Sequence, residues 1–154
     1  MKALLIALLF ISTTSIGQKI SLFDLHKLYP MNLDKSLDYL SIKGWDYDGN
    51  SKGNDADDLT FAYSKRTTGA TAWLSIFNVN SKQKKQISYQ IHIKAYYLSI
   101  KDELTKMGYT FSESRNENGR IVTIYKSSKY IIEINVEPDD EGTTAYMIYL
   151  LPNN

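Results

Sequence analysis

The sequence predicts an α+β fold, in which an antiparallel sheet carries helices on one of its faces. Two segments with helical periodicity come early in the chain, and segments rich in aromatic and β-branched residues follow them. Apolar residues such as Ile87, Tyr89 and Ile91 alternate with polar ones, so one sheet face should pack on helices and the other should stay open. Helices followed by a run of strands are typical of this class.

Residues 1–17 predict a secretory signal peptide that is removed from the mature chain. Lys2 supplies a positive start, residues 3–11 form a short apolar run, and small residues end at Gly17. We therefore expect one exported domain over residues 18–154, in the periplasm or outside the cell. The chain has no cysteine, so neither a lipid anchor nor a disulfide is expected. Export without cysteine is more typical of bacteria than of animals.

The charge balance argues against nucleic acid and membrane partners. Once Lys2 is removed with the signal, basic and acidic residues are equal in number at 17, and a neutral chain has no long-range attraction for such polyanions. The basic cluster at residues 82–85 reads as a solvated turn. After residue 17, no apolar stretch is long enough to cross a membrane.

Two helices are expected next. Ser21 and Asp24 form a capping-box-like start for the first, and Pro30 stops it. The second should cover residues 32–43, with leucines on one side and Gly44 at the position of a C-terminal cap.

Four strands should follow the second helix, separated by Gly, Asn, Asp and Lys. They are expected at residues 45–48, 59–65, 71–78 and 86–95. The third contains residues 72–77, which are apolar on both sides. Leu74 and Ile76 occupy one face. Trp73 and Phe77 occupy the other. We therefore expect a central strand with both faces covered.

The chain then repeats this order. Ser99 and Asp102 resemble the first capping start, and Gly108 ends the helix that they begin. Four more strands are expected, at residues 109–114, 120–126, 130–136 and 143–150.

A constant offset of 64 residues relates the two halves. Leu40, Gly44 and Trp45 correspond to Leu104, Gly108 and Tyr109 at this offset. The match predicts a duplicated unit, with pseudo-repeats at residues 31–95 and 96–151. Sequence identity between the halves is thin, so a chance likeness is the alternative.

Residues 46–57 have the composition of a calcium-binding loop. Oxygen-bearing side chains fall at the spacing of an EF-hand-like loop: Asp46, Asp48, Asn50, Asn54 and Asp57. Two features oppose this interpretation, because Ser51 stands where the loop needs glycine and Asp57 has a shorter arm than the usual glutamate. We expect a flexible acidic hairpin loop and no metal site.

Little in the sequence predicts catalysis. The second acidic loop, residues 137–142, has turn chemistry and needs only water for its charges. His26 is expected on a helix and His92 on the polar face of a strand, without the nucleophile and orienting acid of a known motif. We therefore assign no catalytic residue and no cofactor, and lean against an enzyme. A hydrolase that pairs Glu133 or Glu137 with another acid across the sheet is the least favoured alternative.

Aromatic residues supply the leading functional hypothesis. The chain has 12 tyrosines and 2 tryptophans, and such side chains anchor protein interfaces. Four aromatic residues are expected to share the helix-free face of the sheet: Tyr63, Trp73, Phe77 and Tyr149. There they would hold another exported or envelope protein. The alternative is that they only fill the pleats of the sheet.

An alternative function is that of a carrier, which would bind a small apolar ligand in a pocket between the sheet and the helices. The oligomeric state and the identity of the partner are not predicted. In architecture alone, two helix-plus-four-strand halves resemble the β-lactamase inhibitor protein family, whose concave sheet binds a protein. That resemblance implies a protein partner for the open face.

Overall fold

The computed structural model describes residues 20–52, 57–63, 70–79, 83–138 and 142–153. The predicted signal peptide lies outside them, as do residues 53–56 of the first acidic loop and 139–141 of the second. Within the described part, no helix is both long and apolar enough to cross a membrane.

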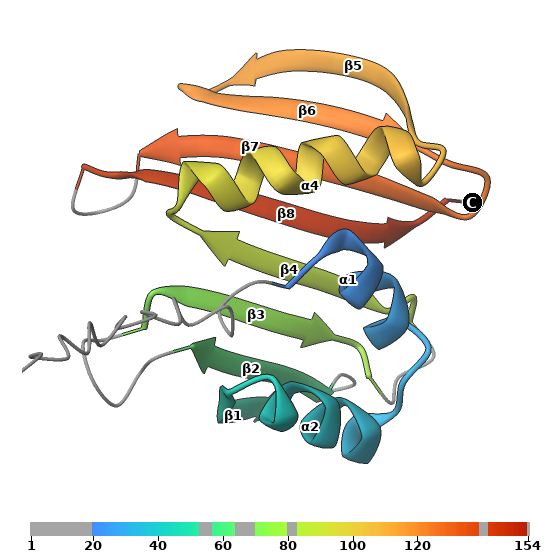
Figure 1. Ribbon diagram of the computed structural model, residues 1–154, viewed down its shortest axis with the longest axis vertical. Helices are drawn as coiled ribbons and strands as arrows, with labels where there is room; N and C mark the ends of the chain where they lie inside the picture. Colours follow the sequence, from blue (N-terminus) through green and yellow to red (C-terminus); the bar gives the residue numbers. More distant parts are fainter. Residues whose placement is uncertain (1–19, 53–56, 64–69, 80–82, 139–141, 154) are drawn as a thin grey trace, which may run out of the picture.

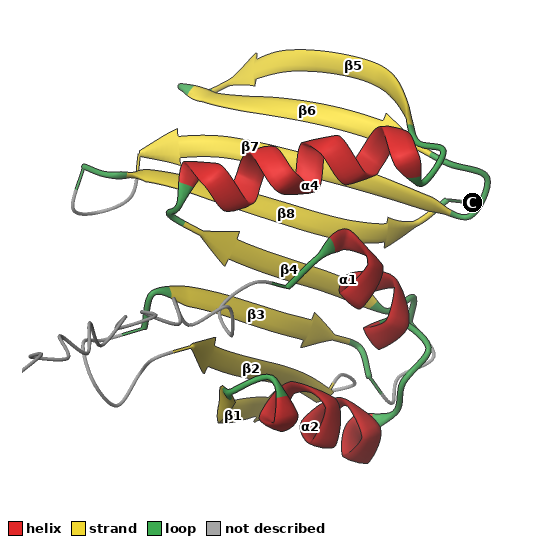
Figure 2. Ribbon diagram, in the orientation of Figure 1, coloured by secondary structure: helices red, strands yellow, loops and turns green. Residues whose placement is uncertain are grey.

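An antiparallel sheet of eight strands forms one layer of the molecule, and the three described helices lie on one of its faces (Figure 1, Figure 2). This confirms the predicted α+β class. The strands are β1 Trp45–Lys52, β2 Asp57–Tyr63, β3 Ala72–Phe77, β4 Gln86–Ile91, β5 Thr110–Glu117, β6 Arg120–Lys126, β7 Tyr130–Pro138 and β8 Thr144–Pro152. The described helices are α1 Leu22–Leu28, α2 Leu33–Ile42 and α4 Lys94–Lys106.

Two meanders make up the sheet, whose strand order is β1-β2-β3-β4-β8-β7-β6-β5. Each strand from β1 to β4 pairs with its neighbour in sequence, and so does each strand from β5 to β8. The two sets meet where β4 pairs with β8, and Tyr89 lies opposite Ile148 in the middle of this seam. The edge strands are therefore β1 and β5.

The first two helices begin where the sequence predicts them. Ser21 and Asp24 form a capping box at α1, in which the Ser21 side chain accepts from the Asp24 N–H. At α2, the Asn32 side chain accepts from the N–H of Lys35. Gly44 follows α2 with a φ of 80°, a conformation that glycine adopts at low cost.

The third described helix begins earlier than its sequence predicts. The pattern of Ser99 and Asp102 predicts a start near residue 99, but α4 begins at Lys94, with Ile93 as its N-cap and no side-chain capping bond. The predicted boundary between the halves, after residue 95, therefore falls in the first turn of a helix.

Packing of the first turns of α4 explains this difference. Tyr97 stacks on Tyr146 of β8, with ring centroids 4.4 Å apart and ring planes at 13°. The preceding strand, predicted over residues 86–95, ends at Ile91, and Ile93 is 39% exposed instead of continuing the buried alternation. Tertiary contact favours a helix where the local pattern favours a strand.

The hydrophobic core lies between the helices and the sheet. The largest of its fully buried side chains is that of Tyr89. Around it pack Phe61, Leu74, Ile76, Ile87, Ile132, Ile134, Ile148 and Leu150 from the strands, and Leu22, Leu25, Leu28, Leu40, Ile100 and Leu104 from the helices.

Strand β3 is fully covered on only one of its faces, which corrects the prediction for residues 72–77. Leu74 and Ile76 are completely buried on the helix side. Trp73 and Phe77 are only half-buried on the other side. The central strands of the sheet are β4 and β8 instead.

Asp24 connects α1 with α2. Asp24 is 8% exposed, and its carboxylate accepts from the Ser21 N–H at 2.9 Å, from the Ser21 hydroxyl at 2.8 Å and from the Tyr39 hydroxyl. The Lys43 ammonium lies 3.1 Å away. Burial by itself would raise the pKa of Asp24, but the hydrogen bonds from Tyr39, Ser21 and Lys43 outweigh burial and hold the pKa below its usual value.

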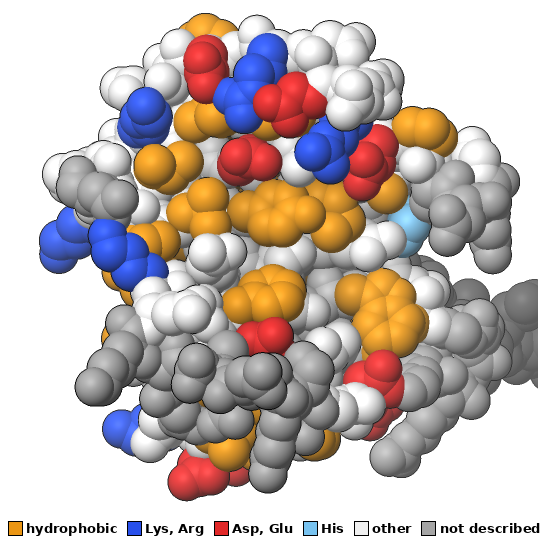
Figure 3. Space-filling view, turned by 180° about the vertical axis from the view of Figure 1, so that it is seen from behind, with side chains coloured by type: hydrophobic (Ala, Val, Ile, Leu, Met, Phe, Trp, Pro, Cys, Tyr) orange, Lys and Arg blue, Asp and Glu red, His pale blue; other side chains and the backbone are white. Residues whose placement is uncertain are grey.

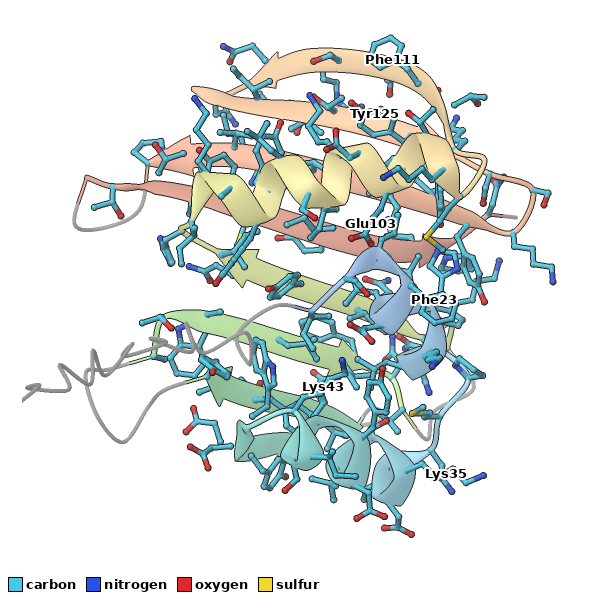
Figure 4. The ribbon with its side chains drawn as sticks, in the orientation of Figure 1. Phe23, Lys35, Lys43, Glu103, Phe111 and Tyr125 are labelled. Carbon is cyan, nitrogen blue, oxygen red and sulfur yellow. The ribbon has the colours of Figure 1, made fainter. Side chains whose placement is uncertain are left out.

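Glu103 links the two halves of the chain. Its carboxylate, on α4, accepts from the backbone N–H of Leu22 at 2.7 Å, in the first turn of α1 (Figure 4). A helix N-terminus has backbone N–H groups without partners in the helix, so the second half satisfies a donor of the first.

Two features of the sheet recur at the offset of 64 residues. The pairing of β1 with β2 shifts register between Tyr47 and Gly49, and the pairing of β5 with β6 shifts between Phe111 and Glu113. An edge-to-face aromatic pair lies beside each bulge. The pairs are Tyr47–Phe61, with centroids 5.7 Å apart, and Phe111–Tyr125, with centroids 6.0 Å apart.

Candidate functional site

The helix-free face of the sheet carries three of the four predicted anchors. Trp73 and Phe77 project from β3, and Tyr149 projects from β8, opposite to the buried side chains of the same strands. Each of the three is half-buried. Figure 3 shows this face, where hydrophobic side chains gather over the central strands.

The three anchors are spread over the face instead of forming one cluster. Trp73 lies opposite Gln90, whereas Tyr149 lies opposite Ser88. Tyr149 is two strands away from β3, which is about 10 Å at the usual strand spacing, and Phe77 is about 13 Å along β3 from Trp73. They offer separate contact points on one broad surface.

Tyr63, the fourth predicted anchor, lies on the other face of the sheet. The strand register sets Tyr63 opposite Ala72, the neighbour of Trp73 in sequence. Because neighbouring residues of a strand point to opposite faces, Tyr63 and Trp73 cannot share one. The Tyr63 ring instead contacts Trp45 on the helix side, with centroids 5.6 Å apart. The expected placement of Tyr63 is corrected accordingly.

Charged side chains border the helix-free face along β5 and β6. Arg115 contacts Glu113 and Glu117, each at 2.5 Å, and Arg120 lies 3.6 Å from Glu117. The hydrogen bond from Arg115 is the main cause that lowers the pKa of Glu117. Exposed pairs of this kind contribute little to stability. They form a charged rim beside the apolar centre (Figure 3).

Polar groups of β7 extend this region toward the centre of the face. Glu133 lies opposite Tyr149, and burial, followed by the negative charges of Glu137 and Glu133, raises the pKa of the Tyr149 hydroxyl. Asn135 is 4% exposed, and its side-chain oxygen has no hydrogen-bond partner among the described residues. A buried acceptor without a donor is unfavourable, so this is a point where the face is incompletely satisfied.

His26, on α1, packs against Tyr109 and Tyr130. Its Nε2 atom lies 2.7 Å from the Tyr109 hydroxyl, and its ring packs edge-on against Tyr130 with centroids 4.9 Å apart. Burial lowers the pKa of His26, and burial raises the pKa of Tyr109 to about 12. Both groups are therefore neutral at pH 7, and their contacts join α1 to the second half of the chain.

Glu133 and Glu137 face no acid across the described strands. Glu133 lies between Ile124 and Tyr149, and Glu137 lies opposite Ala145. Hydrolysis of a glycosidic bond requires two carboxyl groups that flank one bond. No acid lies directly opposite either residue in these strand pairs, and the hydrolase alternative stays the least favoured prediction.

The region with calcium-loop composition begins as a strand. Asp46 and Asp48 lie in β1, so their spacing is extended. In the ranges that the structure describes, no group of three or more histidine, aspartate or glutamate residues is placed to hold a metal ion. Residues 53–56 of this region lie outside those ranges, and the expectation about calcium stays a prediction.

A cleft of about 300 Å³ lies between α2 and the edge strand β1. It is lined by Leu37, Asp38 and Ser41 of α2 and by Trp45, Asp46, Tyr47 and Phe61 of β1 and β2. No local motif in the sequence marks this cleft, because its walls come from separate elements. Its position, between helix and sheet, is that of the pocket in the ligand-carrier alternative. Its acidic and hydroxyl residues do not favour an apolar ligand.

Comparisons with known proteins give no relative for this chain. No family model matches it, and neither a search of curated proteins nor a search of solved structures returned a match. Function is therefore inferred from the geometry and chemistry of these surfaces.

Proposed function

We propose that this chain is exported and serves as a non-catalytic binding protein that holds another exported or envelope protein on its helix-free face. The observation that carries this proposal is the position of Trp73, Phe77 and Tyr149, half-buried on a broad sheet face that no described helix covers. Aromatic side chains of this size bury a large area and often dominate binding energy. The export step rests on residues 1–17, and N-terminal sequencing of the mature protein that returned Met1 would contradict it.

The charged border of the face supports the same role. Protein interfaces commonly surround an apolar centre with a polar, solvent-accessible rim. Arg115, Arg120 and Glu117, on β5 and β6, form such a rim on one side of the face.

Removal of two anchors is expected to reduce partner recovery to about a tenth or less, because two interface aromatic residues together contribute about 2 kcal/mol or more. The measurement is a pull-down from secreted and envelope fractions with wild type and with Trp73→Ala/Phe77→Ala. The matched control, Phe23→Ala/Phe111→Ala, removes two aromatic residues of the helix side that are 56% and 62% exposed. That control should recover the wild-type amount. Equal recovery by a folded Trp73→Ala/Phe77→Ala variant would refute the proposal.

We also propose that residues 31–95 and 96–151 derive from one duplicated unit of a helix and four strands. The recurring bulges and aromatic pairs support this, and so do Gly44 and Gly108, which end the helices with φ of 80° and 77°. With α4 included, the second copy would begin at about residue 94. A profile built from homologues of the first half, once such sequences are collected, should detect the second. Failure to rank it above unrelated sheets would count against duplication.

A further inference from the structure

The cleft between α2 and β1 follows an open edge of the sheet. Trp45, Asp46 and Tyr47, three consecutive residues of this edge strand, all line it. Consecutive side chains of a strand point to opposite faces. The cleft therefore lies along this strand, between the strand and α2, and reaches Phe61 of β2.

The backbone groups of Trp45 and Tyr47 point away from the sheet at this edge. The carbonyl of Tyr63 accepts, at 3.1 Å, an N–H from the residue before β3, so the main chain of Tyr63 bonds toward β3. The N–H and C=O groups of successive residues in a strand point to opposite sides. Those of Ala62, the neighbour of Tyr63, therefore point toward β1, where Ala62 pairs with Asp46. Trp45 and Tyr47 flank Asp46 and therefore direct their N–H and C=O groups outward.

The outer flank of α2 supplies the second wall of the cleft. Leu37 offers an apolar contact, and Asp38 places an exposed carboxylate in the lining. Charge complementarity therefore favours a basic occupant. Trp45 is 3% exposed, and its indole N–H has no acceptor among the described residues.

The opposite edge of the sheet is built differently. β5 carries Glu113, Arg115 and Glu117 at exposed or half-exposed positions on one face, and charged side chains on an edge strand discourage pairing. In the described part of the chain, α4 lies over the central strands and leaves β5 without a flanking helix (Figure 1). A helix and an edge strand thus enclose a cleft at β1.

We propose that an extended peptide segment of a partner protein, carrying lysine or arginine, adds to the edge of β1 in this cleft as a further strand. Its backbone pairs with the outward groups of Trp45 and Tyr47, and its basic side chain lies beside Asp38. In strand addition, main-chain hydrogen bonds supply affinity and the flanking side chains supply selectivity. The cleft is separate from the helix-free face, so this proposal does not depend on the function proposed above.

The test is a titration of the isotope-labelled protein with the peptide N-acetyl-Thr-Lys-Val-Lys-Thr-amide, followed by nuclear magnetic resonance. Saturable shifts are expected at the amides of Trp45 and Tyr47, together with slower hydrogen exchange of both. A peptide N-methylated at its three central residues should bind about tenfold more weakly or worse, because it cannot form the main-chain bonds. A peptide with glutamate in place of both lysines should also bind more weakly.

Two matched protein variants test whether the charge of Asp38 contributes to peptide binding. Asp38→Asn should weaken binding of the lysine peptide about two- to fivefold, the range for one exposed ion pair. Asp102→Asn, which changes an exposed acid of α4, should leave binding unchanged. The proposal is overturned if no saturable shift occurs, if the N-methylated or glutamate peptide binds equally well, or if the shifts map to β5.

Discussion

Replacement of Asp24 with alanine is expected to lower the free energy of unfolding by about 3 kcal/mol. The carboxylate is 8% exposed, and it accepts from the backbone and side chain of Ser21 and from the Tyr39 hydroxyl, while Lys43 lies 3.1 Å away. The substitution removes the carboxylate that completes the capping box of α1. It also leaves the Tyr39 hydroxyl and the Lys43 ammonium without their acidic partner.

The measurement is urea denaturation followed by circular dichroism, with Asp34→Ala as the matched control. Asp34 is an exposed acid in the first turn of α2, so its loss should change the free energy of unfolding by no more than about 0.5 kcal/mol. A loss below about 1 kcal/mol for Asp24→Ala would show that these bonds do not hold the two helices together.

The difference in unfolding free energy between wild type and Asp24→Ala is expected to depend on pH. The pKa of Asp24 in the folded state lies below the ordinary value of 3.8, so the unfolded state binds the proton more tightly. The stabilisation from Asp24 is therefore complete above the unfolded pKa and is lost as the pH falls through the folded pKa. The difference in stability between wild type and Asp24→Ala should narrow below a pH of about 4.

Replacement of Tyr89 with alanine is expected to cost about 4 kcal/mol, the range for removal of a large buried ring. Tyr89 is fully buried at the seam of the two meanders, where it lies opposite Ile148 and packs edge-on against Trp45 with centroids 6.0 Å apart. A cavity there would weaken both halves together. Tyr89→Phe keeps the ring but removes the hydroxyl, which accepts a hydrogen bond from the Ile20 N–H at 3.4 Å, and should cost about 1 kcal/mol.

Denaturation of both variants checks this prediction. The wild type should unfold in a single transition by tryptophan fluorescence and by circular dichroism, because one continuous core crosses the seam. A cost below about 2 kcal/mol for Tyr89→Ala, or separate transitions for the two halves in the wild type, would contradict the role of Tyr89 at the seam.

The first two helices and most strands follow from local patterns. Ser21 and Asp24 form the capping box that their spacing predicts. The second helix lies within its expected range, and the strand predicted over residues 120–126 is β6 without change. The start of α4 does not follow, because the Ser99 pattern lies inside a helix whose first turns are fixed by contacts with another strand. A capping pattern reflects only the local preference of the chain and contains no information about such a contact.

The candidate sites are only partly predictable for the same reason. Alternation places Trp73 and Phe77 on one face of β3, but the face of Tyr63 depends on its register against Ala72, which the sequence does not give. The cleft at β1 joins Asp38 of α2 to Tyr47 of the strand. Such a site exists only once the helix has packed beside the edge, and no spacing in the sequence marks it.

The helix-free face can be tested directly with a photo-crosslinking residue, such as benzoylphenylalanine, at single positions in the producing cell. Positions Trp73 and Tyr149 report on the helix-free face, and positions Phe23 and Phe111 report on the helix side. We expect one protein adduct of the same mass from Trp73 and from Tyr149, and none from Phe23 or Phe111. Adducts from Phe23 or Phe111, with none from Trp73 and Tyr149, would contradict it.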